Sequence, residues 1–277
     1  MNISNETKTN LTSNGAVTGN PFSSVGVSRV LLVLITVSVF WILVKLGFWQ
    51  LARAEYKEQW QATLAMRQQQ APLDYQQLLT LMNPNAPTDA APETALLTGY
   101  RLSIQATPLK QPLLLLDNQV YQGKVGYLAY QLFEVTVDTP WILVELGFVP
   151  AGNDRRELPA LTPILAGQYQ LTGRIYQKQA NPLSDELHPE IHTGKPIRFQ
   201  NINIPALTLL LKHDIATAVL QPDNVPQHSL PQPWVPIPLS AQKHQGYSLQ
   251  WFTMAAVFLG LMGWIMYKQY RRQQKRH

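Results

Sequence analysis

The sequence contains no cysteine and few charged residues. Of its 277 residues, 22 are Lys or Arg and 17 are Asp or Glu, which is 14% of the chain. Without cysteine, the protein cannot form disulfides, thiolate nucleophiles or cysteine-ligated metal sites. The chain also lacks a Walker loop and a G-x-S-x-G elbow, and Gly123 with Gly126 is far short of a dinucleotide fingerprint. We therefore expect no catalytic residues, no metal site, no enzymatic activity and no nucleic-acid partner.

Two segments are apolar and almost without charge. Residues 30–44 contain no charged side chain, the apolar character resumes after Lys45, and residues 247–267 contain no charge at all. Each segment is about the length that crosses roughly 30 Å of hydrocarbon. The sequence therefore predicts transmembrane helices at 29–50 and 246–267. A cleaved signal peptide is the alternative for the first segment, but the preceding residues lack a strong basic cluster and no small-x-small cleavage site follows Trp49.

The charges beside these helices predict how the chain crosses the membrane. Residues 268–277 form a short basic tail, which should stay in the cytoplasm. Two spans then also place residues 1–28, a tail rich in Asn, Ser and Thr that we expect to be disordered, in the cytoplasm. Residues 51–242 would lie in the periplasm of a bacterium, and the protein would be a two-pass protein of the plasma (inner) membrane. Arg53 and Lys57 argue weakly against this orientation, because they lie on the outer side of the first helix.

The segment between the helices is typical of one α+β domain that is mainly antiparallel β with short helices. Residues 55–70 should continue the first helix outward, residues 73–82 form a short helix, and residues 83–93 form a loop. Residues 137–141 read as a hairpin turn, residues 204–220 as a helix, and residues 221–239, with six prolines, as an extended linker back to the membrane. The expected strands are 100–106, 113–116, 126–137, 141–149 and 168–176.

Polar residues gather where the second helix enters the membrane. In helical geometry His244, Tyr247, Ser248 and Trp251 share one face, and Gln250 lies about one turn inside the membrane. A buried amide needs a partner there, so we expect Gln250 to face another helix rather than lipid. For His244 two interpretations stay open: an interfacial polar residue in the aromatic belt, or an axial haem ligand. Further along, Ala256 and Gly260 could allow close approach of the first helix or of a partner.

A polar stripe leaves the membrane on the first helix. Gly47, Gln50, Arg53 and Lys57 follow one face, and Trp49 stands four residues before Arg53, close enough for a cation–π contact. Two cations on one face indicate an anion opposite them. The alternatives are a lipid phosphate, a carboxylate of the domain, and haem propionates. We expect Gly47 and Gln50 to contact another helix or a partner, and the His244 end of the second helix is the first candidate.

A second histidine-containing segment gives the only candidate for a metal site. On a helix, His188 and His192 would share a face at the spacing of a metal pair. However, Glu190 is misplaced for an H-E-x-x-H motif, and Pro189 fits only a helix start. A solvated acidic loop is the favoured interpretation, and a membrane-tethered metalloenzyme is the alternative.

Three motifs stand in order along the chain. They are Gly47-x-Trp49-Gln50-x-x-Arg53-x-x-x-Lys57 in the first helix; Leu116-Asp117-Asn118, Gly123-x-x-Gly126-Tyr127, residues 144–150, Arg155 or Arg156 and Pro159 in the centre; and His244-x-x-Tyr247-x-x-Gln250-Trp251-Phe252 in the second helix. Together they resemble the Surfeit locus protein 1 family of cytochrome c oxidase assembly factors, over about residues 30 to 270. The chain departs from the family's usual Asn-Arg-Gly in the central motif, where it reads Glu145-Leu146-Gly147.

The resemblance implies a factor that helps to deliver haem A to the oxidase catalytic subunit, or that stabilises this subunit. The implied partners are cytochrome c oxidase subunit I, haem A synthase and membrane lipid, and the implied cofactor is transiently bound haem A. In this hypothesis His244 ligates or guides the haem iron, Arg53 and Lys57 attract the propionates, and Tyr247, Trp251 and Trp49 cover the macrocycle. The alternative is a structural scaffold for the oxidase subunit that binds no haem.

Overall fold

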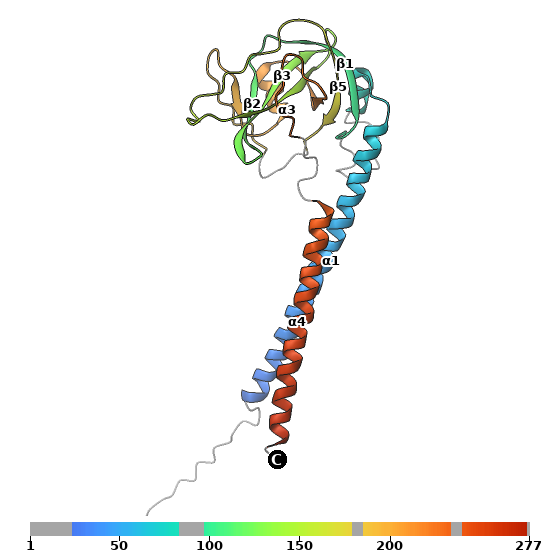
Figure 1. Ribbon diagram of the computed structural model, residues 1–277, viewed down its shortest axis with the longest axis vertical. Helices are drawn as coiled ribbons and strands as arrows, with labels where there is room; N and C mark the ends of the chain where they lie inside the picture. Colours follow the sequence, from blue (N-terminus) through green and yellow to red (C-terminus); the bar gives the residue numbers. More distant parts are fainter. Residues whose placement is uncertain (1–23, 83–96, 179–184, 234–239, 276–277) are drawn as a thin grey trace, which may run out of the picture. The chain divides into compact units, whose positions relative to one another are not determined.

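The computed structural model describes residues 24–82, 97–178, 185–233 and 240–275. The chain divides into two compact units, one formed by Met1–Ala54 with Gln242–His277 and the other by Glu55–Ala241. The first unit is helical, and the second contains every β-strand of the described chain (Figure 1). The predicted tail 1–28 is described only from Ser24, where the first helix begins, and the predicted loop 83–93 lies outside the described residues.

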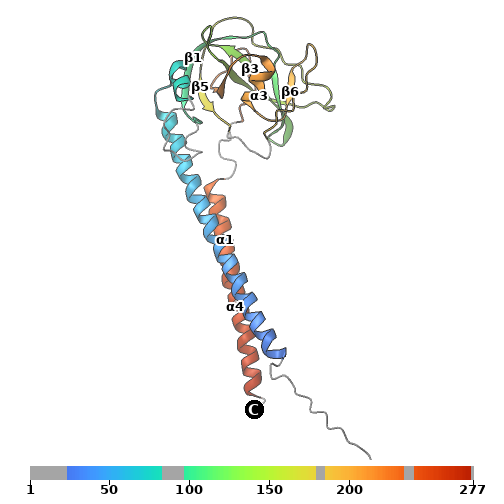
Figure 2. The same ribbon diagram turned by 180° about the vertical axis from the view of Figure 1, so that it is seen from behind.

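The helical unit consists of parts of two long helices. Helix α1 spans Ser24–Gln69 and α4 spans Ala241–Gln274, and the two lie side by side in both views (Figures 1 and 2). Both are long and apolar enough to cross a membrane. Their large apolar side chains are mostly exposed, as lipid-facing residues are. The protein is therefore a two-pass membrane protein.

The contact between α1 and α4 follows a repeat of three and four residues. On α4 the buried residues are Ala241, His244, Ser248 and Ala255, and on α1 the buried Gly47 is followed by the half-buried Gln50. A repeat that averages 3.5 residues keeps one face of each helix in register with its neighbour, as in coiled coils. This register decides which side chains of the two helices meet.

The C-terminal end of α1 belongs to the β unit. Trp60, Leu64 and Arg67 are buried there, and Gly99, with a φ of +94°, lies against Leu64 and Arg67. A Cβ at Gly99 would overlap the Leu64 side chain, so glycine meets both the backbone and the packing requirement. The predicted helical continuation over 55–70 is confirmed to Gln69.

Seven strands form a mixed sheet that closes into a barrel. The order is β1-β5-β7-β4-β3-β2-β6, and an additional β1–β3 pairing closes the ring. Only β2–β6 and β4–β7 are parallel among these pairings, so the predicted α+β, mainly antiparallel fold is confirmed. The strands are β1 Arg101–Pro108, β2 Leu114–Tyr121, β3 Lys124–Glu134, β4 Trp141–Pro150, β5 Tyr169–Tyr176, β6 Ile197–Phe199 and β7 Ile215–Pro222.

Two short helices complete the unit. Helix α2, Tyr75–Leu81, begins with a capping box in which Asp74 accepts from the Gln77 amide and Gln77 accepts from the Asp74 amide. Helix α3, Ile204–Leu211, is capped by Asn203 and ends at Lys212, which has a left-handed φ of 55°. The turn predicted at 137–141 is also present between β3 and β4, with Asp138 at a φ of 65°.

The helix predicted over residues 204–220 is wrong beyond Leu211. After the left-handed Lys212, the chain extends and Ile215–Pro222 becomes β7, paired with β4 on one side and β5 on the other. Ladder hydrogen bonds and burial between two strands outweigh the helical spacing of its apolar residues. The predicted linker 221–239 therefore begins inside a strand, and residues 234–239 lie outside the described part.

The core has two clusters on opposite faces of the central strands. Along β4, Ile142, Val144 and Leu146 pack into one cluster, whereas Leu143 packs into the other with Phe199. Such alternation is expected where a strand is covered on both faces. It also determines the surroundings of Glu145, which lies on the same face of β4 as Leu143.

Candidate functional site

The clearest polar contact within the helical unit joins His244 to Gln50. His244 lies in the first turn of α4 and is 7% exposed, and its Nδ1 lies 2.8 Å from Gln50 Oε1 on α1. Because an amide oxygen can only accept, Nδ1 is the donor in this bond, and the lone pair of the neutral ring is on Nε2. This is the tautomer that a histidine needs in order to ligate a metal through Nε2.

One turn further into the pair, Gly47 and Ser248 meet. The Ser248 hydroxyl donates to the Gly47 carbonyl over 2.9 Å. A Cβ at Gly47 would lie 2.6 to 2.9 Å from ring atoms of Phe252, so only glycine permits this approach. Phe252 also packs edge-on against Phe48, with ring centroids 5.2 Å apart. Gly47 and Gln50 thus both lie in the contact between α1 and α4.

The other residues of the haem hypothesis are distributed differently. Trp251 is half-buried on α4, whereas Tyr247 and Trp49 are 47% and 58% exposed. Arg53 and Lys57 are half-buried and engaged, and the Lys57 ammonium lies 5.7 Å from the Tyr56 ring centroid. The structure therefore brings His244 to Gln50, and it leaves the Trp49 and Tyr247 rings on the surface of the helix pair.

Three predicted contact residues do not take part in the packing of α4 against α1. Gln250, Ala256 and Gly260 are exposed, and no atom lies within 4 Å of a Cβ added at Gly260. Ala255 is buried instead, because a step of one residue turns a helical side chain by about 100°. Contact of Gln250, Ala256 and Gly260 with a partner stays a prediction.

Residues of the central motif hold a bend in the barrel. The β2–β3 register shifts between Leu116 and Gln119, and Asn118 there has a φ of 59°. Asp117 accepts from the Asn118 amide at 2.7 Å and forms an ion pair with Arg155. The same loop is held from a second side, since Arg198 donates to the Arg155 carbonyl at 2.8 Å. These contacts give the residues a structural role in holding the loop.

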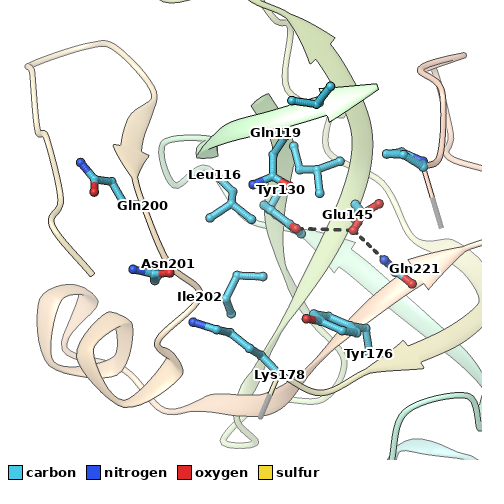
Figure 3. Close-up of a pocket in the computed structure, with 13 residues that line it drawn as sticks. Leu116, Gln119, Tyr130, Glu145, Tyr176, Lys178, Gln200, Asn201, Ile202 and Gln221 are labelled. Atoms are coloured by element: carbon cyan, nitrogen blue, oxygen red, sulfur yellow. Dashed lines mark hydrogen bonds between the residues drawn. The ribbon is translucent and has the colours of Figure 1, made fainter. Parts of the chain in front are cut away.

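Sequence reasoning missed the buried carboxylate of Glu145. It is 2% exposed and accepts from Gln221 Nε2 at 2.8 Å and from the Tyr130 hydroxyl at 3.4 Å (Figure 3). Burial raises the pKa of the Glu145 carboxyl above its ordinary value of 4.5, and these two hydrogen bonds and the charge of Arg174 only partly oppose the shift. The signal in the sequence was a single acidic residue within the apolar run of 141–149.

The segment with His188 and His192 is not a helix. Leu187 is buried in the core, His188 has a φ of 44°, and Glu190 forms a β-bridge with Arg198 of β6. The two histidines therefore do not share a helix face. Within the described ranges, no group of three or more His, Cys, Asp or Glu side chains could hold a metal ion.

One comparison with known proteins identifies the family of the chain. A family model described as SURF1 family matches residues 37–256, which is more than three quarters of the chain. Among curated proteins, none matches the sequence. The matched range includes α1 from Val37, the whole barrel and the part of α4 that carries His244 and Ser248. The chain therefore belongs to the SURF1 family, which is known for cytochrome c oxidase assembly factors.

Proposed function

We propose that this protein assists the delivery of haem A to cytochrome c oxidase subunit I, in cooperation with haem A synthase, at the plasma (inner) membrane. Membership of an oxidase assembly family supports the process, and the apolar helices support the location. The basic residues Lys268, Arg271 and Arg272 at the end of α4 favour cytoplasmic termini and a periplasmic barrel.

The observation that carries the haem proposal is the bond between His244 and Gln50. A ligating histidine is usually oriented by a second group that accepts from its other ring nitrogen. Gln50 Oε1, at 2.8 Å from Nδ1, supplies that acceptor. The chemistry of this pair fits haem iron, and haem A would supply the iron centre and its anionic propionates. In this proposal Arg53 and Lys57 attract the propionates, and Trp251, Tyr247 and Trp49 cover the macrocycle.

The burial of His244 sets a condition on this role. Because the residue is only 7% exposed, groups around Nε2 must move before haem iron can reach it, while Nδ1 keeps its bond to Gln50. The same burial favours a second candidate function, in which the His244–Gln50 bond only holds the helices together. The protein would then be a scaffold that stabilises the oxidase subunit and binds no haem.

Spectra of the purified full-length protein distinguish the two functions. We expect protein isolated from membranes that make haem A to show a haem a absorption spectrum. His244→Ala should abolish it, and Gln50→Leu should shift the spectrum or weaken binding because the ring loses its acceptor. His192→Ala is the matched control, since this histidine lies in an exposed loop. An unchanged spectrum in His244→Ala would remove that residue from the ligand role.

Capture of the oxidase subunit provides the second measurement. The scaffold function predicts that His244→Ala retains subunit I in co-purification and that the wild-type protein carries no haem. The haem function predicts that the variant still captures the subunit, but that the captured subunit lacks haem a. The two predictions differ in the haem content of the subunit.

The proposed orientation can be tested because the chain has no cysteine of its own. A cysteine at Gln122, in the exposed β2–β3 turn, should react with a membrane-impermeant maleimide added to intact spheroplasts. A cysteine at Gln274, at the end of α4, should react only after lysis. The reverse pattern would contradict periplasmic placement of the barrel.

A further inference from the structure

A cavity lies in the β unit beside Glu145. Its volume is about 390 Å³, within the range of about 300–1,000 Å³ that small-molecule sites occupy. Apolar side chains from β2, β3 and the segment before α3 form part of the wall, namely Leu116, Leu128 and Ile202. Polar groups gather on another part of the wall, from β3, β4, β5 and β7 (Figure 3).

The polar part of the wall is rich in acceptors. The Glu145 carboxylate already receives two neutral donors at its Oε2, from Gln221 and from Tyr130. Gln221 donates to Glu145 through its Nε2, and its Oε1 is buried without a hydrogen-bond partner among the described residues. The Gln221 residue is 8% exposed. A buried carbonyl oxygen without a donor is costly, and a group that donates to it would recover that cost.

Carboxylates lie beside the cations around the cavity. Lys178, which also lines the wall, forms an ion pair with Asp185, with Nζ 3.5 Å from Oδ1, and its buried Nζ makes no hydrogen bond among the described residues. Arg101 forms an ion pair with Asp223, and the charge of Asp223 also acts on Arg174. The charge of Arg174 opposes the rise in the pKa of the Glu145 carboxyl, but burial has the larger effect and the pKa stays raised. The cavity therefore offers acceptors at Glu145 and Gln221 and the ammonium of Lys178. The side-chain amides of Gln119, Gln200 and Asn201 also line it, and those of Gln119 and Asn201 donate to backbone carbonyls.

We propose that this cavity binds a small organic molecule through an N–H-bearing head group, an ammonium or a primary amide, which donates to Gln221 Oε1 and to the Glu145 carboxylate. The Tyr130 and Tyr176 side chains flank the head group, and a cation there gains from aromatic faces. A short aliphatic chain packs on Leu116, Leu128 and Ile202. If the head group is a primary amide, its carbonyl oxygen can accept a hydrogen bond from Lys178 Nζ. This site is independent of the proposed role in haem delivery.

Matched four-carbon probes test the head group on the full-length protein in nanodiscs. Saturation-transfer NMR and calorimetry are used with n-butylammonium, butyramide and butyrate at neutral pH. We expect saturable binding of butylammonium, butyramide or both, and at least tenfold weaker binding of butyrate. Binding of butylammonium alone identifies charge as the source of recognition, and binding of butyramide alone identifies neutral hydrogen bonding. Equal or stronger binding of butyrate, or no saturable binding of any probe, overturns the proposal.

Two variants test the named acceptors. Gln221→Leu removes the unpartnered oxygen and should weaken binding of both N–H probes at least tenfold, whereas Gln76→Leu, on the exposed face of α2, should not. Glu145→Gln keeps the shape of the side chain and should weaken butylammonium selectively, with Glu157→Gln as the exposed control. Should Gln221→Leu fail to fold, Glu145→Gln alone decides. Retention of wild-type affinity for both probes in a folded Glu145→Gln or Gln221→Leu variant contradicts the assignment.

Discussion

Replacement of Gly47 by alanine should weaken the contact between α1 and α4. The added Cβ would lie 2.6, 2.8 and 2.9 Å from three ring atoms of Phe252. Ordinary carbon contacts are about 3.5–4.0 Å, so the ring or the helix must move by roughly 1 Å. Phe252 cannot move freely, because its ring packs edge-on against Phe48. Overpacking of this kind costs about 1–3 kcal/mol.

Gly260→Ala on α4 is the matched control. Alanine gains about 1 kcal/mol of helix propensity over glycine at both positions. No atom lies within 4 Å of a Cβ at Gly260, so this variant reports the propensity change without the clash. The difference between the two variants therefore isolates the contact. It should be about 1–3 kcal/mol, or roughly 5-fold to 150-fold in the pairing equilibrium.

Distance measurements between spin labels can follow this pairing. The native chain has no cysteine, so nitroxides attach only at Leu51→Cys on α1 and Leu249→Cys on α4, where the native side chains are 47% and 70% exposed. We expect Gly47→Ala to broaden the distance distribution in nanodiscs and to separate the helices at lower SDS than Gly260→Ala does. Coincident distributions and SDS midpoints would refute the argued clash.

Three further changes test the β unit. Arg67→Met removes a 2.8 Å hydrogen bond to the Thr98 carbonyl and the contact of the guanidinium with the Tyr100 ring. The variant should lower the unfolding free energy by about 2–3 kcal/mol and increase hydrogen exchange in residues 55–69. Glu145→Gln should flatten the pH dependence of stability. The raised pKa of Glu145 means that the folded state binds the carboxyl proton more tightly than the unfolded state does. Wild-type stability therefore falls as the pH rises from the ordinary pKa of 4.5 through the raised pKa. Thermal unfolding from pH 4 to 8 measures this fall. Gly147→Ala should cost at least about 2 kcal/mol, because φ is +123° and the added Cβ would lie 2.8 Å from the Pro231 carbonyl oxygen; a melting temperature equal to that of Gly152→Ala would contradict this.

Local chemistry in the sequence was enough to predict several elements. The apolar runs predict both long helices, because roughly twenty apolar residues in a row have few alternatives to a membrane. Asp138 and Pro140 predict the turn between β3 and β4, and alternating apolar residues predict most strands. Such patterns depend on residues near one another in the chain, so they predict structure without knowledge of the fold.

Residues 204–222 show where local signals end. The spacing of Leu207, Leu210 and their neighbours supports a helix, and α3 forms there. The next residues are apolar at a similar spacing, yet they form β7. They do so because β7 can pair with β4 on one side and with β5 on the other. Pairing partners that lie about 40 to 80 residues away decided the structure of this segment.

The sequence by itself determined the two membrane helices, the β class of the domain and the membership of an oxidase assembly family. It also placed Gly47, Gln50 and His244 on polar faces of their helices. The sequence also made the His244 end of the second helix the first candidate to face the stripe with Gln50. The tertiary structure alone decided that His244 Nδ1 bonds Gln50 Oε1, that Gly260 stays outside the contact, and that Glu145 faces a cavity with Gln221. These outcomes depend on the register between helices and on barrel closure, which arise from contacts between residues far apart in the chain.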